Sequence, residues 1–247
     1  MTNPLLTAKL QIPPLRPRYV PRPRLLARLH EGMQRKLTLI STPPGFGKTT
    51  LLTAWLKESA LPAAWVTLDE ADNDHGRFIG YVMAALDRLD LGLEEPIHEI
   101  SESAARGIPL ESQMTFLLNG LASMPATSTP ILLVLDDYHV IQNQAIHDSM
   151  TYALEYIPGN VHIYIASRSA PPLPLSRWRA RNQLNELRSE DLRFTRDEAD
   201  FFLNQSSGLG LSALHVAALD DRTEGWIAGL QLAALALSGH SNTEQFI

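Results

Sequence analysis

The sequence contains no cysteine, which excludes a disulfide framework and any metal site built on thiolates. It also lacks a long apolar run. The longest apolar run of low charge covers residues 226–237, whereas a membrane-spanning helix needs about 20 residues. We interpret this run as a buried helix. The N-terminal segment has no basic start leading into an apolar core, so it is a poor candidate for a signal peptide. We therefore expect a cytoplasmic protein with no membrane segment.

Basic residues are also scarce, and they are unevenly spread. The net charge of -6 over 247 residues argues against nucleic-acid binding across the whole surface. Residues 1–50 contain nine Lys and Arg and one acid, whereas residues 69–103 contain ten acids and two arginines. A basic segment of this kind can bind nucleic acid or phosphate, or it can simply be solvated. The hydrophobic content of 45% is typical of a globular protein with a sizeable core.

Short apolar runs alternate with segments of helical periodicity over most of the chain. The runs at 36–41, 63–69, 130–141 and 161–168 have the length and composition of strands, and helices are predicted between each run and the next. Continuous apolar strands separated by helices are typical of a parallel sheet that is covered on both faces. The sequence therefore predicts an α/β fold with a mainly parallel sheet flanked by helices.

The pattern changes near Ser189, after which only helices are predicted. Thr195 and Glu198 have the spacing of a capping box, and Gly208 is a candidate helix stop. The predicted organisation has three parts: a lead-in at 1–35, an α/β core at 36–189, and a small all-α domain at 190–247. Within the lead-in, residues 1–24 are rich in proline and arginine and are predicted to be extended, and a short helix is predicted after them.

A phosphate-binding motif lies between the first strand and its helix. The stretch STPPGFGKTT matches G-x-x-x-x-G-K-[ST], except that Thr42 replaces the first glycine. Such a loop directs successive backbone N–H groups at phosphate oxygens, at a helix N-terminus that favours anions. Because Thr42, Pro43 and Pro44 precede the donors, the replacement should cost little. The predicted nucleotide contacts in the loop are Gly45, Phe46, Gly47, Lys48, Thr49 and Thr50. The alternative is a strand–turn–helix without a ligand.

Charged side chains at the expected places supply the chemistry of such a site. Lys48 would reach the β- and γ-phosphates, and the hydroxyl of Thr49 would bind Mg²⁺. Asp136, at the end of an apolar strand, would hold the metal through water, and Asp137 would orient or deprotonate the attacking water. Arg168, at the tip of the next strand, would sense the γ-phosphate and stabilise charge in the transition state. The alternative for Asp136 and Asp137 is an ordinary polar strand end, and the alternative for Arg168 is an arginine on the surface without a ligand.

Together with their flanks, these motifs resemble a known family. The chain resembles the nucleotide-binding region of the MalT-like, large ATP-binding LuxR-type transcriptional regulators, which belong to the STAND class of P-loop ATPases. The resemblance covers almost the whole chain. It rests on TAKLQIPPLRPRYVPRPRLLARL, STPPGFGKTTLLTAWL, WVTLDEADNDHGRFIGYVMAAL, LLVLDDYHVI, ASRSAPPLPLSRWRARNQLNELRSEDLRFTRDEA and TEGWIAGLQLAALAL.

The resemblance implies an ATP-dependent switch. In such regulators ADP is held at rest between the sheet domain and the helical domain; inducer and ATP then open the molecule and let it self-associate, and hydrolysis resets it. The implied ligands are ATP or ADP and Mg²⁺, and the implied enzyme activity is weak ATP hydrolysis. By the same resemblance, Val20, Arg22 and Arg24 would line the adenine side of the site.

The resemblance has two further implications. Gly225 and Trp226 correspond to the segment with which the helical domain contacts nucleotide, although Ile227 replaces the proline that is usual there; the alternative for Trp226 is a core aromatic on a buried helix. Such regulators also carry a sensor and a C-terminal DNA-binding domain beyond this region, so the chain is expected to be a truncated piece or a shorter stand-alone ATPase. DNA binding is expected only through a C-terminal domain that is absent from this chain.

Two other functions stay open. A P-loop phosphotransferase would need an acceptor site and a mobile lid, for which 176–181 is a weak candidate. A scaffold would bind nucleotide without hydrolysing it. The acidic stretch 68–74 is predicted to be a capped, solvated turn rather than a metal site. A structural role is favoured for His139, and the alternative is a contact with nucleotide or a partner.

Overall fold

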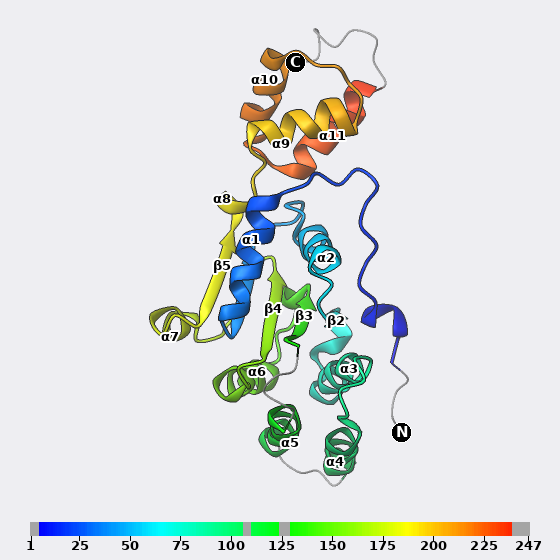
Figure 1. Ribbon diagram of the computed structural model, residues 1–247, viewed down its shortest axis with the longest axis vertical. Coiled ribbons are helices and arrows are strands. Elements are labelled where there is room, and N and C mark those ends of the chain that lie inside the picture. Colours follow the sequence, from blue (N-terminus) through cyan, green and yellow to red (C-terminus); the bar gives the residue numbers. More distant parts are fainter. Residues whose placement is uncertain (1–4, 106–109, 124–128, 239–247) are drawn as a thin grey trace.

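A computed structural model describes residues 5–105, 110–123 and 129–238 of the chain. Its strands form one sheet in the order β2-β3-β4-β1-β5, and every neighbouring pair is parallel (Figure 1). The strands are β1 (Leu37–Ser41), β2 (Ala63–Thr67), β3 (Ile131–Asp136), β4 (Val161–Ser167) and β5 (Leu184–Arg188). The predicted parallel sheet flanked by helices is confirmed. The sequence missed β5, because its five residues LNELR are mostly polar and lie at an edge of the sheet.

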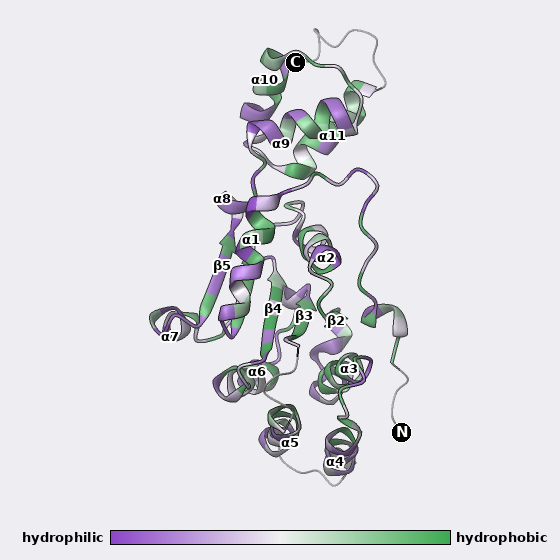
Figure 2. Ribbon diagram, viewed as in Figure 1, coloured by the Kyte–Doolittle hydropathy of each residue, from purple (hydrophilic) through white to green (hydrophobic). Residues whose placement is uncertain are grey.

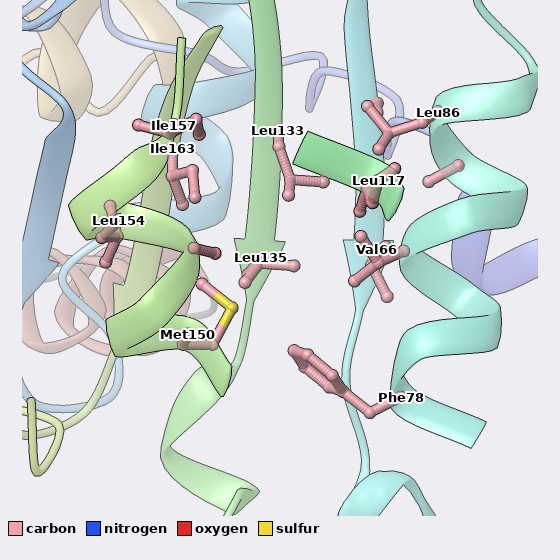
Figure 3. Close-up of a cluster of buried hydrophobic side chains, with 14 of the residues drawn as sticks. Val66, Phe78, Leu86, Leu117, Leu133, Leu135, Met150, Leu154, Ile157 and Ile163 are labelled. Carbon is pink, nitrogen blue, oxygen red and sulfur yellow. The ribbon is translucent and has the colours of Figure 1, made fainter. Parts of the chain in front are cut away.

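Helices cover both faces of this sheet. Along β3, Leu133 and Leu135 face one cluster of buried side chains and Leu132 and Val134 face another, as the two-residue period of a strand requires. Figure 2 shows the central strands as hydrophobic along their length, and Figure 3 shows the cluster between the sheet, α3 and α6. The covering helices are α1 (Pro23–Glu31) and α2 (Lys48–Ser59) on one face, and α3 (His75–Asp87), α4 (Glu94–Ala105), α5 (Leu110–Ala122) and α6 (Gln144–Tyr156) on the other.

The register of the sheet brings three loops to one edge. Ser41 of β1 lies opposite Ser167 of β4, and Leu135 near the end of β3 lies opposite Ile165. Because the strands are parallel, their carboxyl ends meet there, which is where open α/β sheets bind ligands. The phosphate loop, the Asp136 turn and Arg168 follow directly from these strand ends. The short helices between the main elements are η2 (Gly32–Gln34), η3 (Glu70–Asn73), η4 (Tyr138–Val140) and α7 (Leu175–Ala180).

The chain after β5 is helical and has its own buried cluster, which Val20 of the N-terminal segment joins. Its elements are α8 (Ser189–Leu192), α9 (Arg196–Asp200), the π-helix η5 (Phe201–Ser206), α10 (Ala213–Thr223) and α11 (Ile227–Ser238). The predicted capping box of Thr195 and Glu198 is confirmed. The single helix predicted from Thr195 is wrong in one respect, because it widens into the π-helix, from which the Asn204 side chain binds the backbone of Leu211.

Helix α11 is only partly buried, which corrects the expectation of a buried helix. Leu230, Ala234 and Leu237 face the core, whereas Leu232 and Leu235 are exposed. The apolar composition of this segment predicted that the helix is buried on all sides, but the small helical domain covers α11 on one side only. Within the described ranges, no helix combines the length and the apolar composition that crossing a bilayer requires.

The N-terminal segment 5–22 is tied to the core by a buried ionic cluster. It begins with a 3₁₀ helix, η1 (Thr7–Leu10), which was predicted as extended chain. Lys9 of this helix is buried and pairs with Asp69 at 2.9 Å and with Asp72, and Arg77 also binds Asp72 at 3.0 Å. The stretch 68–74 is capped as predicted, but Asp72 is fully buried rather than solvated. Its partner Lys9 lies far away in the sequence, so no local pattern indicated the burial.

Arginines in and just before α1 form ion pairs and hydrogen bonds with the helical domain. Arg22 is buried and pairs with Glu198 at 3.0 Å, and it donates to the carbonyl oxygen of Arg193 at 2.7 Å. Arg24 contacts the same carboxylate at 3.3 Å, and Arg28 pairs with Asp191 at 3.3 Å. Glu198 therefore serves both as the third helical residue of a capping box and as the acceptor for Arg22 and Arg24 at the start of α1.

Replacement of Glu198 by glutamine should loosen this contact. The amide keeps one acceptor for the helix cap but loses the charge opposite Arg22, so we expect the free energy of unfolding to fall by about 1 kcal/mol. Urea denaturation at neutral pH measures the change. The matched control is Glu190→Gln, at an exposed position of α8, which should change stability by less than about 0.5 kcal/mol. Equal effects of the two variants would contradict this role of Glu198.

Candidate functional site

The phosphate loop has the backbone that its motif requires. Gly45 and Gly47 have φ of +83° and +77°, a region that favours glycine, and α2 begins at the next residue, Lys48. Thr42 is buried, and its amide donates to the carbonyl oxygen of Ser167 at 3.2 Å, so it continues the sheet pairing. A β-branched residue is comfortable in that conformation, which explains why the missing first glycine leaves the loop intact.

Lys48 is a buried cation that is held by neutral partners. Its Nζ donates to the carbonyl oxygens of Thr42 at 2.7 Å and Pro43 at 3.1 Å, and its side chain is 8% exposed. Burial lowers the pKa of Lys48, while the nearby Asp137 and Asp136 oppose that change. A charge that is removed from water and bonded only to carbonyls favours an anionic ligand beside it.

Thr49 and Asp136 meet directly. The hydroxyl of Thr49 donates to Oδ2 of Asp136 at 2.8 Å, and Asp136 is 2% exposed. Burial raises the pKa of Asp136 to about 6, although the bond from Thr49 acts in the opposite direction. A hydroxyl and a carboxylate are the oxygen ligands that Mg²⁺ accepts when phosphates and water complete its shell. The pair fits that ion, even though the described residues contain no group of three or more His, Asp or Glu arranged to hold a metal alone.

A second carboxylate and two basic groups lie beyond this pair. Asp137 has a left-handed backbone with φ of +58°, and its Oδ1 lies 3.6 Å from Nδ1 of His139. Burial lowers the pKa of His139, and the positive charge of Arg168 lowers it further. We therefore treat His139 as neutral at physiological pH. Arg168 follows β4, and within the described part of the chain it has no acidic partner at ion-pair distance.

A cavity of about 260 Å³ joins the loop to the N-terminal segment and the helical domain. Five cationic side chains and one carboxylate line it, so the site strongly favours an anion. The charged lining residues are Arg16, Arg18, Arg22, Lys48, Arg168 and Asp137, and the others are Tyr19, Val20, Pro44, Gly45, Gly47, Thr49, Thr50, Leu51, Phe194, Phe202, Ile227 and Gln231.

The same cavity has an aromatic and apolar wall. The rings of Phe194 and Phe202 lie 6.1 Å apart, and the guanidinium of Arg22 lies over Phe194 at 5.0 Å from its centroid. Val20 and Tyr19 complete this wall from the N-terminal segment. A cavity with a cationic part and an aromatic part suits a ligand that combines phosphates with a planar base.

Most of the predicted site residues line this cavity, and three do not. Phe46 packs against the buried cluster around α2. Asp136 lies behind Thr49, to which it is bonded. Arg24 points to the helical domain, where it binds Glu198 and the carbonyl oxygens of Asp191 and Arg193. The residues that the structure brings together at the cavity are Val20, Arg22, Gly45, Gly47, Lys48, Thr49, Thr50, Asp137 and Arg168.

Sequence reasoning missed the aromatic wall and two cations. Phe194 and Phe202 reach the cavity only because the helical domain folds back onto α1, which no local pattern reveals. Arg16 and Arg18 belong to the basic N-terminal segment, so the uneven charge was the available signal for them.

The helical domain also touches the phosphate loop itself. The indole Nε1 of Trp226 donates to the carbonyl oxygen of Pro44 at 3.1 Å, and the amide of Ala228 donates to that of Gly45 at 3.1 Å. Ile227, at the position where the resemblance expects proline, lines the cavity, whereas Trp226 does not. Trp226 therefore contacts the loop itself, and its contact with nucleotide stays a prediction.

No protein-family model matches the chain. Its fold is similar to that of a Signal Transduction ATPase with Numerous Domains (STAND) protein with a tetratricopeptide repeat sensor from Pyrococcus horikoshii, with a TM-score of 0.60 and 16% identity over 89% of this chain. It is also similar to a Walker-type ATPase of Pyrococcus abyssi, with a TM-score of 0.55 and 12% identity over 91% of this chain. The chain spans 30% of the first protein and 69% of the second. Together with the parallel sheet and the loop geometry, these similarities show that the chain has the fold of P-loop ATPases.

Proposed function

We propose that this chain is a nucleotide-binding module that takes ATP and ADP with Mg²⁺. The observation that carries the proposal is the position of Lys48. It is a buried cation at the start of α2, in a cavity with a large excess of positive charge and an aromatic wall. Phosphates would replace the carbonyl contacts of Lys48 with charged ones, and the base would lie against Phe194 and Phe202. The pair formed by Thr49 and Asp136 would hold Mg²⁺.

The residues around this position suit slow hydrolysis. Mg²⁺, when bound, neutralises charge on the phosphate oxygens. Asp137 and Arg168 line the same cavity as Lys48, so Asp137 would orient a water molecule or accept its proton, and Arg168 would hold the terminal phosphate. The ring of His139 lies 3.6 Å from Asp137 and stays neutral, because burial and the positive charge of Arg168 lower its pKa. With these roles the module would be a weak ATPase, in which hydrolysis returns the ATP-bound state to the ADP-bound state.

We further propose that the module is the ATP/ADP switch of a cytoplasmic transcriptional regulator of the MalT-like type. Support comes from the sequence resemblance and from a cavity that 1–35, 36–189 and 190–247 line together, so that nucleotide would couple these parts. Self-association would accompany the ATP state, and contact with DNA would belong to a separate C-terminal domain. A scaffold that binds but does not hydrolyse nucleotide, and a small-molecule phosphotransferase, are the alternatives.

Nucleotide retained by the purified protein tests the binding proposal. The chain is denatured, and any released nucleotide is identified by chromatography. We expect ADP or ATP in stoichiometric amounts. An empty chain that also fails to take up ATP with Mg²⁺ contradicts the proposal. If nucleotide is bound but turnover is zero and unchanged in Asp137→Asn, the scaffold is favoured; steady phosphate transfer to an added acceptor favours the phosphotransferase.

Arg168 is expected to distinguish ATP from ADP. Replacement by alanine removes the cation that would contact only the terminal phosphate, so we expect affinity for ATP to fall about tenfold while affinity for ADP changes less than about twofold. Calorimetric titration with each nucleotide in the presence of Mg²⁺ measures both values. Arg88→Ala, at an exposed position of α3's C-terminus, is the control. An equal loss of affinity for ADP and ATP would contradict this, because Arg168 would then attract both nucleotides by its charge and would not contact the terminal phosphate specifically.

A further inference from the structure

The carbonyl groups of the phosphate loop are bound by a second helix N-terminus. Helix α11 begins at Ile227, and the first N–H groups of a helix have no partner within it. The amide of Ala228 instead donates to Gly45, and the indole of Trp226 donates to Pro44, each at 3.1 Å. Two consecutive carbonyls of the loop are therefore held from the helical domain.

Peptide planarity turns this contact into an orientation of the loop. In a trans peptide the C=O and the following N–H point in opposite directions. Holding the Pro44 carbonyl directs the N–H of Gly45 away from Trp226, and holding the Gly45 carbonyl directs the N–H of Phe46 away from Ala228. These are the first amides of the loop that can donate, because Pro43 and Pro44 have none.

The fit between the two segments is close. A Cβ atom on Gly45 would lie 2.6 Å from Cβ of Ala228 and 2.7 Å from Nε1 of Trp226, so only glycine allows the approach. On the other side, Gly225 has φ of +68°, and its carbonyl accepts from the amide of Phe194 at 2.9 Å. The turn before α11 is thus fixed to the segment that supplies the aromatic wall.

We propose that Trp226 is a positioning residue that holds the phosphate loop in its anion-binding form. Its indole N–H fixes the first peptide of the loop before any ligand arrives, and the ring itself stays outside the cavity at 37% exposure. This role rests on the proposed nucleotide binding. The hydrogen bond from Trp226 to Pro44 itself is present without any nucleotide. Loss of the donor frees the loop and lowers affinity for phosphates without removing any group that would touch them.

The test combines hydrogen exchange of the nucleotide-free protein with ADP titration. Trp226→Phe keeps an aromatic ring but has no donor, so we expect the Ala228 amide to exchange about tenfold faster and ADP to bind about tenfold more weakly. Gly229→Ala keeps the indole donor, but the added Cβ would lie 2.8 Å from Cε3 of Trp226 and displace the ring. We therefore expect the same two changes as for Trp226→Phe. Leu235→Ala, exposed on the same helix, should change neither quantity.

Each outcome decides the proposal. Unchanged exchange at Ala228 in both Trp226→Phe and Gly229→Ala, with ADP binding intact, overturns the positioning role alone. Faster exchange with unchanged ADP affinity also overturns it, because the loop then binds phosphate without this support. If the wild-type chain takes up no ADP, the proposed nucleotide site fails and the role of Trp226 fails with it.

Discussion

Replacement of Lys48 by alanine should reduce affinity for ADP at least about 100-fold, or by about 2.8 kcal/mol. The ammonium group is buried, and in the free protein it donates only to the carbonyls of Thr42 and Pro43. Phosphate oxygens would replace these neutral acceptors with anionic ones, so that the donor and the acceptor of each hydrogen bond are both charged. Titration calorimetry with ADP and Mg²⁺ on nucleotide-stripped protein measures the loss.

The matched control for this variant lies on the same helix. Lys57→Ala removes a lysine from the last turn of α2, away from the loop, and should change ADP affinity less than about twofold. Both variants should keep the far-UV spectrum and a cooperative thermal transition. A fall of less than about fivefold for Lys48→Ala would mean that the loop does not hold the phosphates, whatever else binds in the cavity.

Replacement of Asp136 by asparagine should stabilise the nucleotide-free protein at neutral and alkaline pH. Burial raises the pKa of this carboxyl to about 6, so folding favours its protonated form. The resulting penalty is absent below about pH 3, grows as pH rises from about 4, the pKa of an unfolded aspartate, to about 6, and is nearly complete above about pH 7. Asparagine removes the charge and still accepts from Thr49, but its NH₂ group takes the place of Oδ1, which accepts from the backbone N–H of Asp137 at 3.1 Å. Because the loss of that bond offsets part of the relief, we expect a gain of about 2 kcal/mol at pH 8.

Urea denaturation at pH 8 and pH 4.5 measures this pH dependence. The gain should be largely lost at the lower pH, because the wild-type carboxyl is then mostly protonated. Asp137→Asn is the control. Its side chain is 41% exposed and its backbone is left-handed, a conformation that asparagine tolerates, so we expect a change of less than about 0.5 kcal/mol at both pH values. A pH-independent effect of Asp136→Asn would contradict the raised pKa.

Local patterns in the sequence were enough to predict the α/β core. The apolar runs that became β1 to β4 are continuous, and the glycines and Lys48 mark the turn between β1 and α2. The positions of Asp136 and Arg168 followed from the same pattern, because parallel strands end at one edge of the sheet. These predictions depend on short-range periodicity and on one topological rule, which is why they could be made.

Features that depend on contacts between distant segments could not be predicted. Strand β5 is an edge strand of mixed polarity, so its five residues carry no period-two pattern. The burial of Asp72 depends on Lys9, and the position of Phe194 in the cavity depends on how Arg22 and Glu198 join the two parts. The contact of Trp226 with the phosphate loop is of the same kind, because donor and acceptor are 182 positions apart in the sequence.

Direct titration of the nucleotide-stripped wild-type chain with ADP and with ATP, each with Mg²⁺, tests the central claim most directly. The cationic cavity around Lys48 predicts one site per chain with a dissociation constant in the micromolar range or below, and binding that weakens when Mg²⁺ is chelated. Absence of heat or fluorescence change up to about millimolar nucleotide would contradict it, and the chain would then share the fold of P-loop ATPases without their ligand.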